Sequence, residues 1–355
     1  MTTIPTIDLG RFSAGSAAER EAIAHAFDEA FRTVGFCSLS NYEHLLPEEA
    51  VVALRTQGEA FFALPAAEKQ KSYVDGVCGY LGPGAENVAA TTGEPSAEPD
   101  QVESLNIPAY QDPPWRAAAA EAECPWVKAS WLPASAAFCD AALAYFCGVT
   151  RVMTELMRLA ELALALPPGL FDASYQRPGT LLRIAWYPPP AGKADTERPL
   201  YAAHTDFDGF TLLQRGEEEA GGGLQIWSGG EWMTVGATPR TLTINIGDLL
   251  ARWTNDRWRS TKHRVMRPTA SHHHHHHQQQ QQQLSPQASS SSSPPPRGRL
   301  SLVYFTGPHP DTLVECLPSA KCQPSDGGPP RYAPITAYEH VLAKMHKATE
   351  EARSG

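Results

Sequence analysis

Two histidines and one aspartate are the residues of this chain whose types and spacing most directly suggest chemistry. His204 and Asp206 are separated by one residue, and His263 follows fifty-seven residues after Asp206. Two imidazoles and one carboxylate form the ligand set of many non-haem Fe(II) sites, which leaves the opposite positions open for substrate, co-substrate and O₂. Asp208 is a second carboxylate nearby, but alternate residues of an extended chain share a side, which favours Asp206. The triad predicts an oxygenase that binds one Fe(II).

A run of six histidines is the other candidate metal-binding element. It lies in segment 271–296, which reads Ser-His₆-Gln₆-Leu-Ser-Pro-Gln-Ala-Ser₅-Pro₃. This composition cannot bury enough apolar surface to offset the entropy lost on ordering, so we expect disorder. The run could capture Ni²⁺ or Zn²⁺, or serve as a metal buffer or interaction segment, but it lacks a rigid carboxylate partner. We favour an insertion that is tolerated in a surface loop.

The elements that must position the triad change in type along the chain. Ser16 and Glu19 form a capping box that predicts a helix ending near Gly35, with a strand after it. A second helix is predicted over 136–166, and residues 76–115, rich in Gly and Pro, are expected to be irregular. Strand-like patterns follow at 180–186, 211–214, 223–227, 232–235, 241–246 and 299–305. Many short strands favour a mainly β jelly-roll core supported by a helical N-terminal half.

Composition restricts the class of protein further. The chain has 355 residues and a net charge of −10, and it contains no basic block, so nucleic acid and anionic membranes are unlikely partners. The N-terminus lacks a signal-peptide pattern and no uninterrupted apolar run approaches about 18 residues, so we expect a cytoplasmic protein. The odd number of dispersed cysteines favours reduced thiols; they are Cys37, Cys78, Cys124, Cys139, Cys147, Cys316 and Cys322.

The motifs around the triad resemble the 2-oxoglutarate/Fe(II)-dependent dioxygenase superfamily, and within it the isopenicillin N synthase-like branch. The segments that carry the resemblance are 4–9, 34–36, 79–80 with Glu86, 103–104, 131–133, 202–214, 223–226, 244–248, 260–265 and 299–301. Together they span most of the chain. The resemblance implies a double-stranded β-helix (jelly-roll) core, with Fe(II), O₂ and 2-oxoglutarate as cofactor and co-substrates, and with ascorbate as a possible support.

The same resemblance assigns the residues that bind the co-substrate. Arg299 and Ser301 match the family's Arg-x-Ser motif, whose guanidinium and hydroxyl bind the distal carboxylate of 2-oxoglutarate. Tyr187 matches a tyrosine that commonly hydrogen-bonds the co-substrate, whereas Ala185 stands where many relatives have an asparagine. Phe305 matches an inward-facing position, and lining the substrate pocket and plain core packing remain equally open for it.

The spacing between His263 and Arg299 is longer than in the family and is explained by the insertion. Relatives place the arginine about ten residues after the distal histidine, and here the separation is thirty-six. Segment 271–296 contains twenty-six residues, so its removal restores the usual distance. Loop closure costs grow slowly with length, which makes such an insertion tolerable.

We therefore divide the chain into four regions. Residues 1–115 form an N-terminal dioxygenase region, 116–175 a helical support, 176–310 the jelly-roll core with the insertion, and 311–355 a C-terminal segment with a helix. The predicted reaction is hydroxylation of a small organic molecule with release of succinate and CO₂, by a protein expected to be a monomer. The alternatives are an oxidase that cyclises or desaturates its substrate without 2-oxoglutarate, an ethylene-forming enzyme, and a non-catalytic binding relative.

Overall fold

The architecture comes from a computed structural model, which describes residues 4–74, 78–92, 99–108, 135–189, 198–216, 223–267 and 298–344. Its helices are α1 (Leu9–Ala14), α2 (Ala17–Thr33), α3 (Glu48–Phe62), α4 (Ala66–Lys69), α5 (Ala136–Ala163), α6 (Asp172–Tyr175) and α7 (Asp248–Trp253), with 3₁₀ turns η1 (Gln70–Ser72) and η2 (Val88–Thr92). Its strands are β1 (Thr6–Asp8), β2 (Phe36–Ser40), β3 (Gly79–Leu81), β4 (Glu103–Pro108), β5 (Leu181–Tyr187), β6 (Tyr201–His204), β7 (Phe210–Arg215), β8 (Leu224–Ser228), β9 (Glu231–Thr234), β10 (Leu242–Ile246), β11 (His263–Val265), β12 (Arg299–Phe305), β13 (Leu313–Val314) and β14 (Ile335–Thr336).

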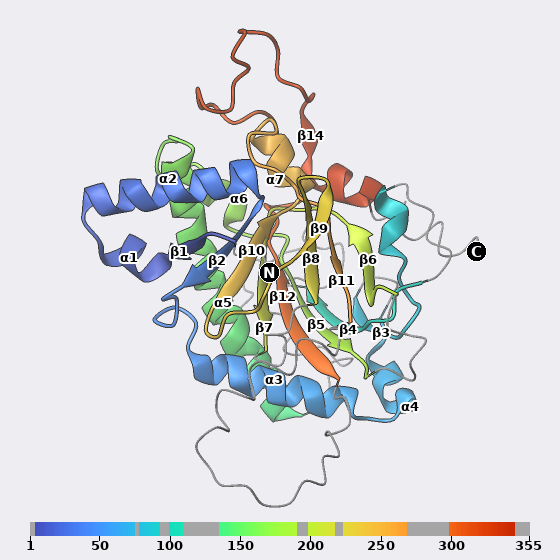
Figure 1. Cartoon of the computed structure of the whole chain (residues 1–355). Helices are drawn as coiled ribbons and strands as arrows, with labels where there is room; N and C mark the ends of the chain where they lie inside the picture. Colours follow the sequence, from blue (N-terminus) through green and yellow to red (C-terminus); the bar gives the residue numbers. More distant parts are fainter. Residues whose placement is uncertain are drawn as a thin grey trace, which may run out of the picture.

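Two sheets form the centre of the molecule. The large sheet has the order β1-β2-β10-β7-β12-β5-β4-β3, and the smaller one has the order β6-β11-β8-β9. Figure 1 shows β6, β8, β9 and β11 in front of and beside the strands of the large sheet. The mainly β jelly-roll fold with a helical scaffold is therefore confirmed.

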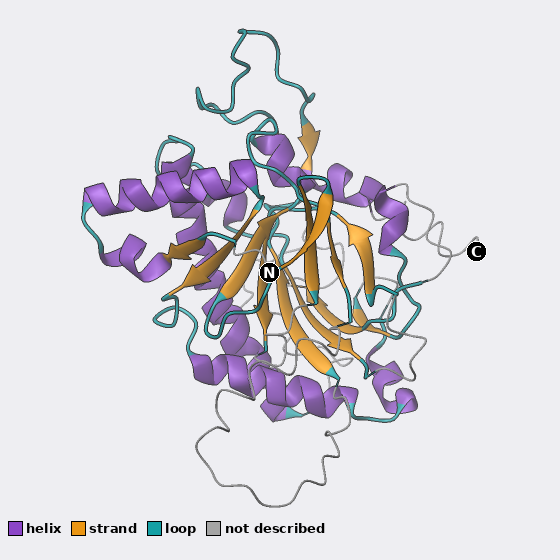
Figure 2. Cartoon of the chain, in the orientation of Figure 1, coloured by secondary structure: helices purple, strands orange, loops and turns teal. Residues whose placement is uncertain are grey.

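Helices cover the outer face of the large sheet. On β12, the even-numbered residues Leu300, Leu302 and Tyr304 are fully buried in the main hydrophobic core, and α3 packs against Leu300 through Gly58. The odd-numbered residues, which include Arg299 and Ser301, face the other way because side chains alternate along a strand. Figure 2 shows the long helices along the left and lower sides of the strands. The inner face of the sheet is thus left for polar side chains.

The long helix α5 is a core helix. Its composition and length would allow it to cross a membrane, and it is the one such helix in the described part of the chain. It packs against α2 and α3, however, and fifteen of its residues are buried. Burial within the protein explains its apolar composition.

The predicted capping box of α2 is present, and a tight hairpin joins two of the predicted strands. Ser16 and Glu19 exchange the two hydrogen bonds of a capping box, and α2 ends just before Gly35, which adopts a φ of +76°. Gly229 and Gly230 both have positive φ and connect β8 to β9, as a tight hairpin requires. All six predicted strands are observed with ends shifted by at most two residues.

One prediction about the N-terminal half is wrong. Residues 76–115 are not irregular throughout, because β3 and β4 lie within them and pair at the edge of the large sheet. The strand expected after the first helix is observed as β2, and β1 to β4 together supply four strands of the large sheet. β4 is difficult to predict because three of its six residues, Glu103, Ser104 and Asn106, are polar, so its sequence shows only a short alternation of apolar and polar residues.

Candidate functional site

The two candidate histidine ligands are cross-strand neighbours. His204 ends β6 and His263 begins β11, and the antiparallel register places them directly opposite each other. Their ring centroids lie 4.2 Å apart, and both side chains are buried. Tyr201 packs edge-on to His204 and Phe36 packs edge-on to His263. The two rings are therefore fixed by strand pairing and by one aromatic neighbour each.

The loop that carries Asp206 is held by α7. The backbone N–H of Asp248 donates to the carbonyl of Asp206 at 2.8 Å, and that of Leu249 donates to the carbonyl of Phe207 at 3.1 Å. The hydroxyl of Thr205 donates to the carboxylate of Asp248 at 3.0 Å. The first turn of α7 thus uses its otherwise unpaired amides to fix the loop between β6 and β7.

The ring nitrogens are oriented for metal binding. Nδ1 of His204 lies 2.8 Å from the carbonyl of Ala202, and Nδ1 of His263 lies 3.0 Å from the carbonyl of Thr261. Since carbonyls only accept, each Nδ1 carries the proton, and each Nε2 presents its lone pair. Both Nε2 atoms face Oδ1 of Asp206, at 3.5 and 3.6 Å. Donor atoms of the three residues all lie within 4.8 Å of one another, as ligands of one metal ion do.

The second carboxylate oxygen of Asp206 is used by the protein. Oδ2 accepts a hydrogen bond from the hydroxyl of Thr211 and another from the amide of Asn245, both at 2.6 Å. Thr211 on β7 and Asn245 on β10 are direct partners in the register of the large sheet. Two adjacent strands therefore fix the carboxylate so that Oδ1 alone points toward the two imidazoles.

The protonation states also suit a cation. Burial, together with the nearby His204, lowers the pKa of His263 to about 4, so this imidazole is neutral at pH 7. Burial raises the pKa of Asp206, but His263, His204 and Thr211 outweigh it and leave the pKa below its ordinary value. Because imidazoles bind metals in their neutral form, two histidines and one carboxylate would supply one negative charge, which fits a divalent metal such as Fe(II).

The residues predicted to bind the co-substrate lie together on the inner face of the large sheet. Arg299 on β12 pairs with Tyr187 on β5, and its guanidinium lies 4.7 Å from the centre of the Tyr187 ring. Arg299 also donates to the carbonyl of Met266, just beyond β11, at 3.1 Å. Ser301 lies on the same face two residues further along β12 and is buried. A cation, a phenol and a hydroxyl are thus brought to one wall of the space between the sheets.

Gly223 allows Arg299 to occupy this place. A Cβ added at Gly223 would lie 2.0 Å from Nη1 of Arg299, and the φ of Gly223 is +155°. Residues with a side chain rarely adopt this φ, and an added Cβ would displace the guanidinium from its present place.

Phe305 continues the same face of β12 toward the metal site. It pairs directly with Thr211, whose hydroxyl binds Asp206, and it remains partly exposed. Ala185, where relatives have an asparagine, pairs with Ser301 and is buried among apolar residues. Segment 271–296, with the histidine run, lies outside the described residues.

Asp208 is separated from the triad. A Cβ on Gly307 would collide with its carboxyl, which places that carboxyl against the chain just after β12. Burial raises the pKa of Asp208 well above its ordinary value. Asp206, and not Asp208, is the carboxylate beside the two histidines.

Two supporting residues were missed by sequence reasoning. Thr211 and Asn245 both lie in predicted strands, and nothing in a strand pattern marks a polar residue as a partner of a ligand. An asparagine with an isoleucine on each side, as in Ile244-Asn245-Ile246, is the one available signal, because a buried amide needs a partner.

Comparisons with known proteins agree with this geometry. The model of the 2OG-Fe(II) oxygenase superfamily matches residues 178–308, and the model of the N-terminal region of non-haem dioxygenases in morphine synthesis matches residues 4–128. Validamycin A dioxygenase of Streptomyces hygroscopicus subsp. limoneus is 29% identical over 76% of this chain and 73% of its own length. The 2-oxoglutarate-Fe(II) type oxidoreductase ppzC of Metarhizium rileyi is 31% identical over 74% of this chain and 73% of its own length.

Solved structures share the fold. A full-length Neurospora crassa protein in complex with alpha-KG and thymine superposes with a TM-score of 0.72 at 24% identity, covering 96% of both chains. A putative 2OG-Fe(II) oxygenase from Caulobacter crescentus gives a TM-score of 0.72 at 24% identity, covering 98% of this chain and 99% of the other. The chain belongs to the 2OG-Fe(II) oxygenase superfamily. It is an Fe(II)- and 2-oxoglutarate-dependent enzyme that oxidises a small molecule.

Proposed function

We propose that this enzyme hydroxylates a small organic substrate, with iron held by His204, Asp206 and His263. The observation that carries the metal assignment is the convergence of both Nε2 atoms on Oδ1 of Asp206. When bound, Fe(II), 2-oxoglutarate and O₂ would together supply the oxidising power, with O₂ as the oxidant and 2-oxoglutarate converted to succinate and CO₂. The protein contributes ligation, orientation and exclusion of water.

We further propose that Arg299 binds the distal carboxylate of 2-oxoglutarate. A guanidinium suits a carboxylate because two parallel N–H groups can donate to its two oxygens. Arg299 is buried, so its charge acts with little screening, and the hydroxyls of Ser301 and Tyr187 are placed on the same sheet face to donate hydrogen bonds. Phe305, between this wall and Thr211, is proposed to line the substrate side.

The test is succinate formation from 2-oxoglutarate with Fe(II) and O₂, with and without candidate small molecules. His204→Ala is expected to abolish it by removing a ligand, and Arg299→Gln is expected to raise the KM for 2-oxoglutarate more than tenfold while Fe(II) affinity is retained. Turnover unaffected by His204→Ala would contradict the metal assignment. O₂ consumption without 2-oxoglutarate would favour the oxidase alternative.

We also propose the branch of the superfamily, the cellular location and the oligomeric state of the protein. The match of its N-terminal region to the morphine-synthesis dioxygenase model supports the isopenicillin N synthase-like branch. Its acidic composition and dispersed cysteines support a cytoplasmic location, and we propose a monomer, which size-exclusion chromatography with light scattering tests.

A further inference from the structure

An open pocket of about 610 Å³ lies outside the space between the two sheets. Its walls come from α7, from the segment that leads into His263, and from the helical turns at 337–344. The lining residues are Trp227, Asp248, Ala251, Arg252, Asp256, Trp258, Arg259, Ser260, Thr261, Lys262, Tyr332, His340 and Lys344. This volume is within the range of small-molecule sites in proteins.

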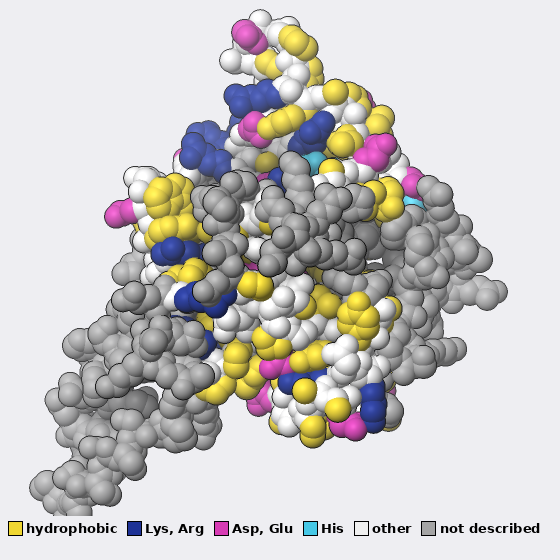
Figure 3. Space-filling view, turned by 90° about the vertical axis from the view of Figure 1, so that its right-hand side faces the viewer, with side chains coloured by type: hydrophobic (Ala, Val, Ile, Leu, Met, Phe, Trp, Pro, Cys, Tyr) yellow, Lys and Arg dark blue, Asp and Glu magenta, His cyan; other side chains and the backbone are white. Residues whose placement is uncertain are grey.

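The pocket is positively charged although the chain is acidic. Four basic side chains line it, against two acidic ones, whereas the chain as a whole carries a net charge of −10. The basic residues are Arg252, Arg259, Lys262 and Lys344. Figure 3 shows lysine and arginine side chains gathered near a histidine in the upper part of this face of the molecule. A local excess of positive charge in a concave site attracts small anions.

Both acidic residues already have cationic partners. Asp248 accepts from Nζ of Lys344 at 2.6 Å, and Asp256 accepts from Arg331, outside the lining, at 3.1 Å. The hydroxyl of Tyr332 also donates to Asp256, at 2.8 Å. The two carboxylates are therefore engaged before any ligand binds, and the excess of basic groups in the lining remains.

Part of the pocket is held rigidly. The guanidinium of Arg252 lies 4.8 Å from the centre of the Tyr332 ring and donates to the carbonyl of Ala333 at 2.5 Å. On another wall, Trp227 remains 43% exposed and offers an indole surface next to Lys262, whose backbone carbonyl accepts from the backbone N–H of Trp227. A fixed cation and an exposed aromatic surface suit a ligand that has both an anionic group and a flat ring.

The pocket also contacts both segments that carry metal ligands. Asp248 binds Thr205, which lies between His204 and Asp206, and the carbonyl of Thr261 accepts from His263. A ligand in this pocket would contact Asp248 and Thr261, which are hydrogen-bonded to Thr205 and to His263, without entering the active site.

We propose that this pocket binds a second small molecule, a dianion carried on a planar ring, independently of 2-oxoglutarate and substrate. Arg259 and Lys262 supply the adaptable charges, Arg252 a fixed one, and Trp227 the aromatic surface. The proposal concerns a site separate from the triad and does not depend on the reaction that the triad performs.

Isothermal titration calorimetry with phenyl phosphate tests the proposal. The enzyme is loaded with Fe(II) and 2-oxoglutarate under nitrogen, so that the co-substrate site is already filled. We expect saturable binding with a Kd below about 1 mM in low salt, weakened at high salt because exposed charges are screened. Phenol, which has the ring without the charge, is expected not to bind.

A charge-matched pair of variants gives the control. Arg259→Gln combined with Lys262→Gln should weaken phenyl phosphate at least tenfold, whereas Arg20→Gln combined with Lys71→Gln, two exposed positions away from the pocket, should leave the Kd unchanged. Quenching of intrinsic fluorescence by phenyl phosphate should also diminish in Trp227→Phe. No saturable binding, equal weakening by both double variants, or quenching unaltered in Trp227→Phe would each overturn the proposal.

Discussion

In the candidate metal site, the two carboxylate oxygens of Asp206 have different surroundings. Oδ1 faces the two imidazoles, and Oδ2 accepts from Thr211 and Asn245. A carboxylate held in this way binds through one oxygen, which leaves a coordination position for the co-substrates. The hydrogen-bond partners of metal ligands contribute to affinity because they reduce the freedom that a ligand loses on binding.

Removing either partner should weaken metal binding. Thr211→Val and Asn245→Leu are each expected to lower Fe(II) affinity by about 10- to 100-fold, the usual effect of losing such a partner. Anaerobic titration, or titration with Co(II) followed by its visible spectrum, measures the change without turnover. Thr234→Val, on β9 with its hydroxyl near Gln225, is the matched control and should bind metal as the parent does. Unchanged affinity in both site variants would show that strand pairing alone positions Asp206.

Gly223 should control the affinity for 2-oxoglutarate. Gly223→Ala is expected to displace the guanidinium of Arg299 and raise the Kd for 2-oxoglutarate at least tenfold, because the added Cβ overlaps Nη1. Fe(II) affinity should be retained. Gly229→Ala is the control, since Gly229 also has a positive φ but nothing lies within 4 Å of its added Cβ. Equal effects of the two substitutions on 2-oxoglutarate binding would attribute the loss to backbone strain and not to Arg299.

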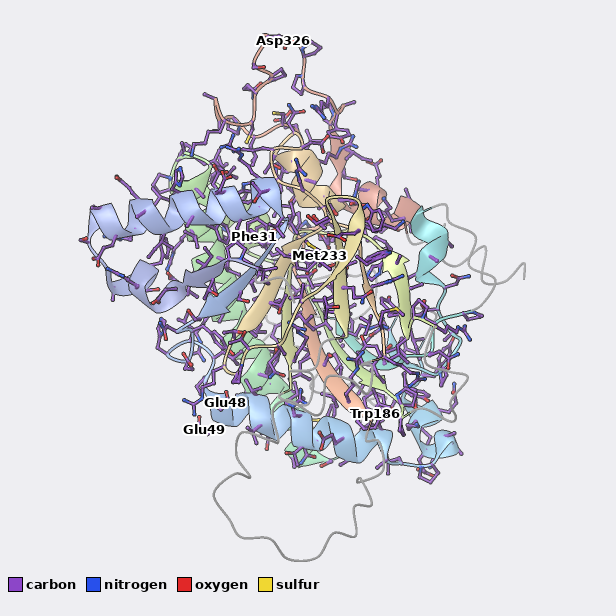
Figure 4. The ribbon with its side chains drawn as sticks, viewed as in Figure 1. Phe31, Glu48, Glu49, Trp186, Met233 and Asp326 are labelled. Carbon is purple, nitrogen blue, oxygen red and sulfur yellow. The ribbon has the colours of Figure 1, made fainter. Side chains whose placement is uncertain are left out.

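At the scale of elements, the segment leading to His263 is tied to α2 by one buried carboxylate. Asp28 on α2 accepts from Arg257 at 2.5 and 2.9 Å and from the indole N–H of Trp258 at 2.9 Å. Trp258 in turn packs against Phe27, Phe31 and Phe210. Figure 4 labels Phe31 at the end of α2 nearest the central strands. The helix thereby positions the chain five residues before His263, a candidate metal ligand.

Breaking this link should cost stability in a pH-dependent manner. Asp28→Asn is expected to lower the free energy of unfolding at pH 7 by about 2 kcal/mol, less than for a fully enclosed pair because Arg257 keeps 19% of its side chain exposed. Burial raises the pKa of Asp28, but Arg257 and Trp258 lower it more, so the folded pKa lies below the unfolded one. The contribution of the ionised Asp28 to the free energy of unfolding is therefore complete above about pH 4, and it is lost as the pH falls through the folded pKa.

Urea unfolding at several pH values measures this effect. The difference in unfolding free energy between the parent and Asp28→Asn should stay constant from about pH 6 to about pH 4 and shrink as the pH falls further. Glu29→Gln, at an exposed neighbouring position in a 3.6 Å pair with Arg32, should change stability by less than about 1 kcal/mol. A difference that also stays constant below about pH 4 would mean that packing, and not the charge of Asp28, stabilises the segment.

Elements were predictable from the sequence where one physical signal dominated. The capping box marked α2, and alternating or β-branched runs marked β5, β7, β10 and β12. The strands that hold the histidines, β6 and β11, were missed because they are only four and three residues long and their burial does not alternate. The first turn of α7, which fixes Asp206, is likewise too short to show a helical period. The three candidate ligands, which lie together in the structure, could be named from the sequence, but the elements and hydrogen bonds that position them could not.

At the scale of the whole molecule, the C-terminal segment adds a protrusion to the sheet core. β13 and β14 pair antiparallel, and the chain between them projects from the top of the molecule, with Asp326 near its tip and Trp186 and Met233 in the body below (Figure 4). Arg331, in the chain that leads back to β14, donates a hydrogen bond to the carboxylate of Asp256. This segment contains few apolar residues at regular spacing, so its backbone conformation depends on tertiary contacts and could not be predicted from a local sequence pattern.

The insertion at 271–296 should be dispensable for the chemistry. On either side of it, the carbonyl of Met266 and the guanidinium of Arg299 are joined by a 3.1 Å hydrogen bond, so the core already brings the two ends of the loop together. Deleting 271–296 leaves a short link between β11 and β12. We expect unchanged Fe(II) and 2-oxoglutarate affinities and, since a shorter loop loses less entropy on closure, a gain in stability on the order of 1–2 kcal/mol.

Calorimetric melting and co-substrate titration of the deletion variant check this expectation. Replacing the six histidines with serines while keeping the loop length is the control, because it separates the effect of metal capture from that of loop closure. A loss of Fe(II) affinity in both variants would assign the histidine run a role in metal supply. A loss of 2-oxoglutarate affinity in the deletion alone would mean that the length of the loop is needed to place Arg299, and that the insertion is part of the architecture of the site.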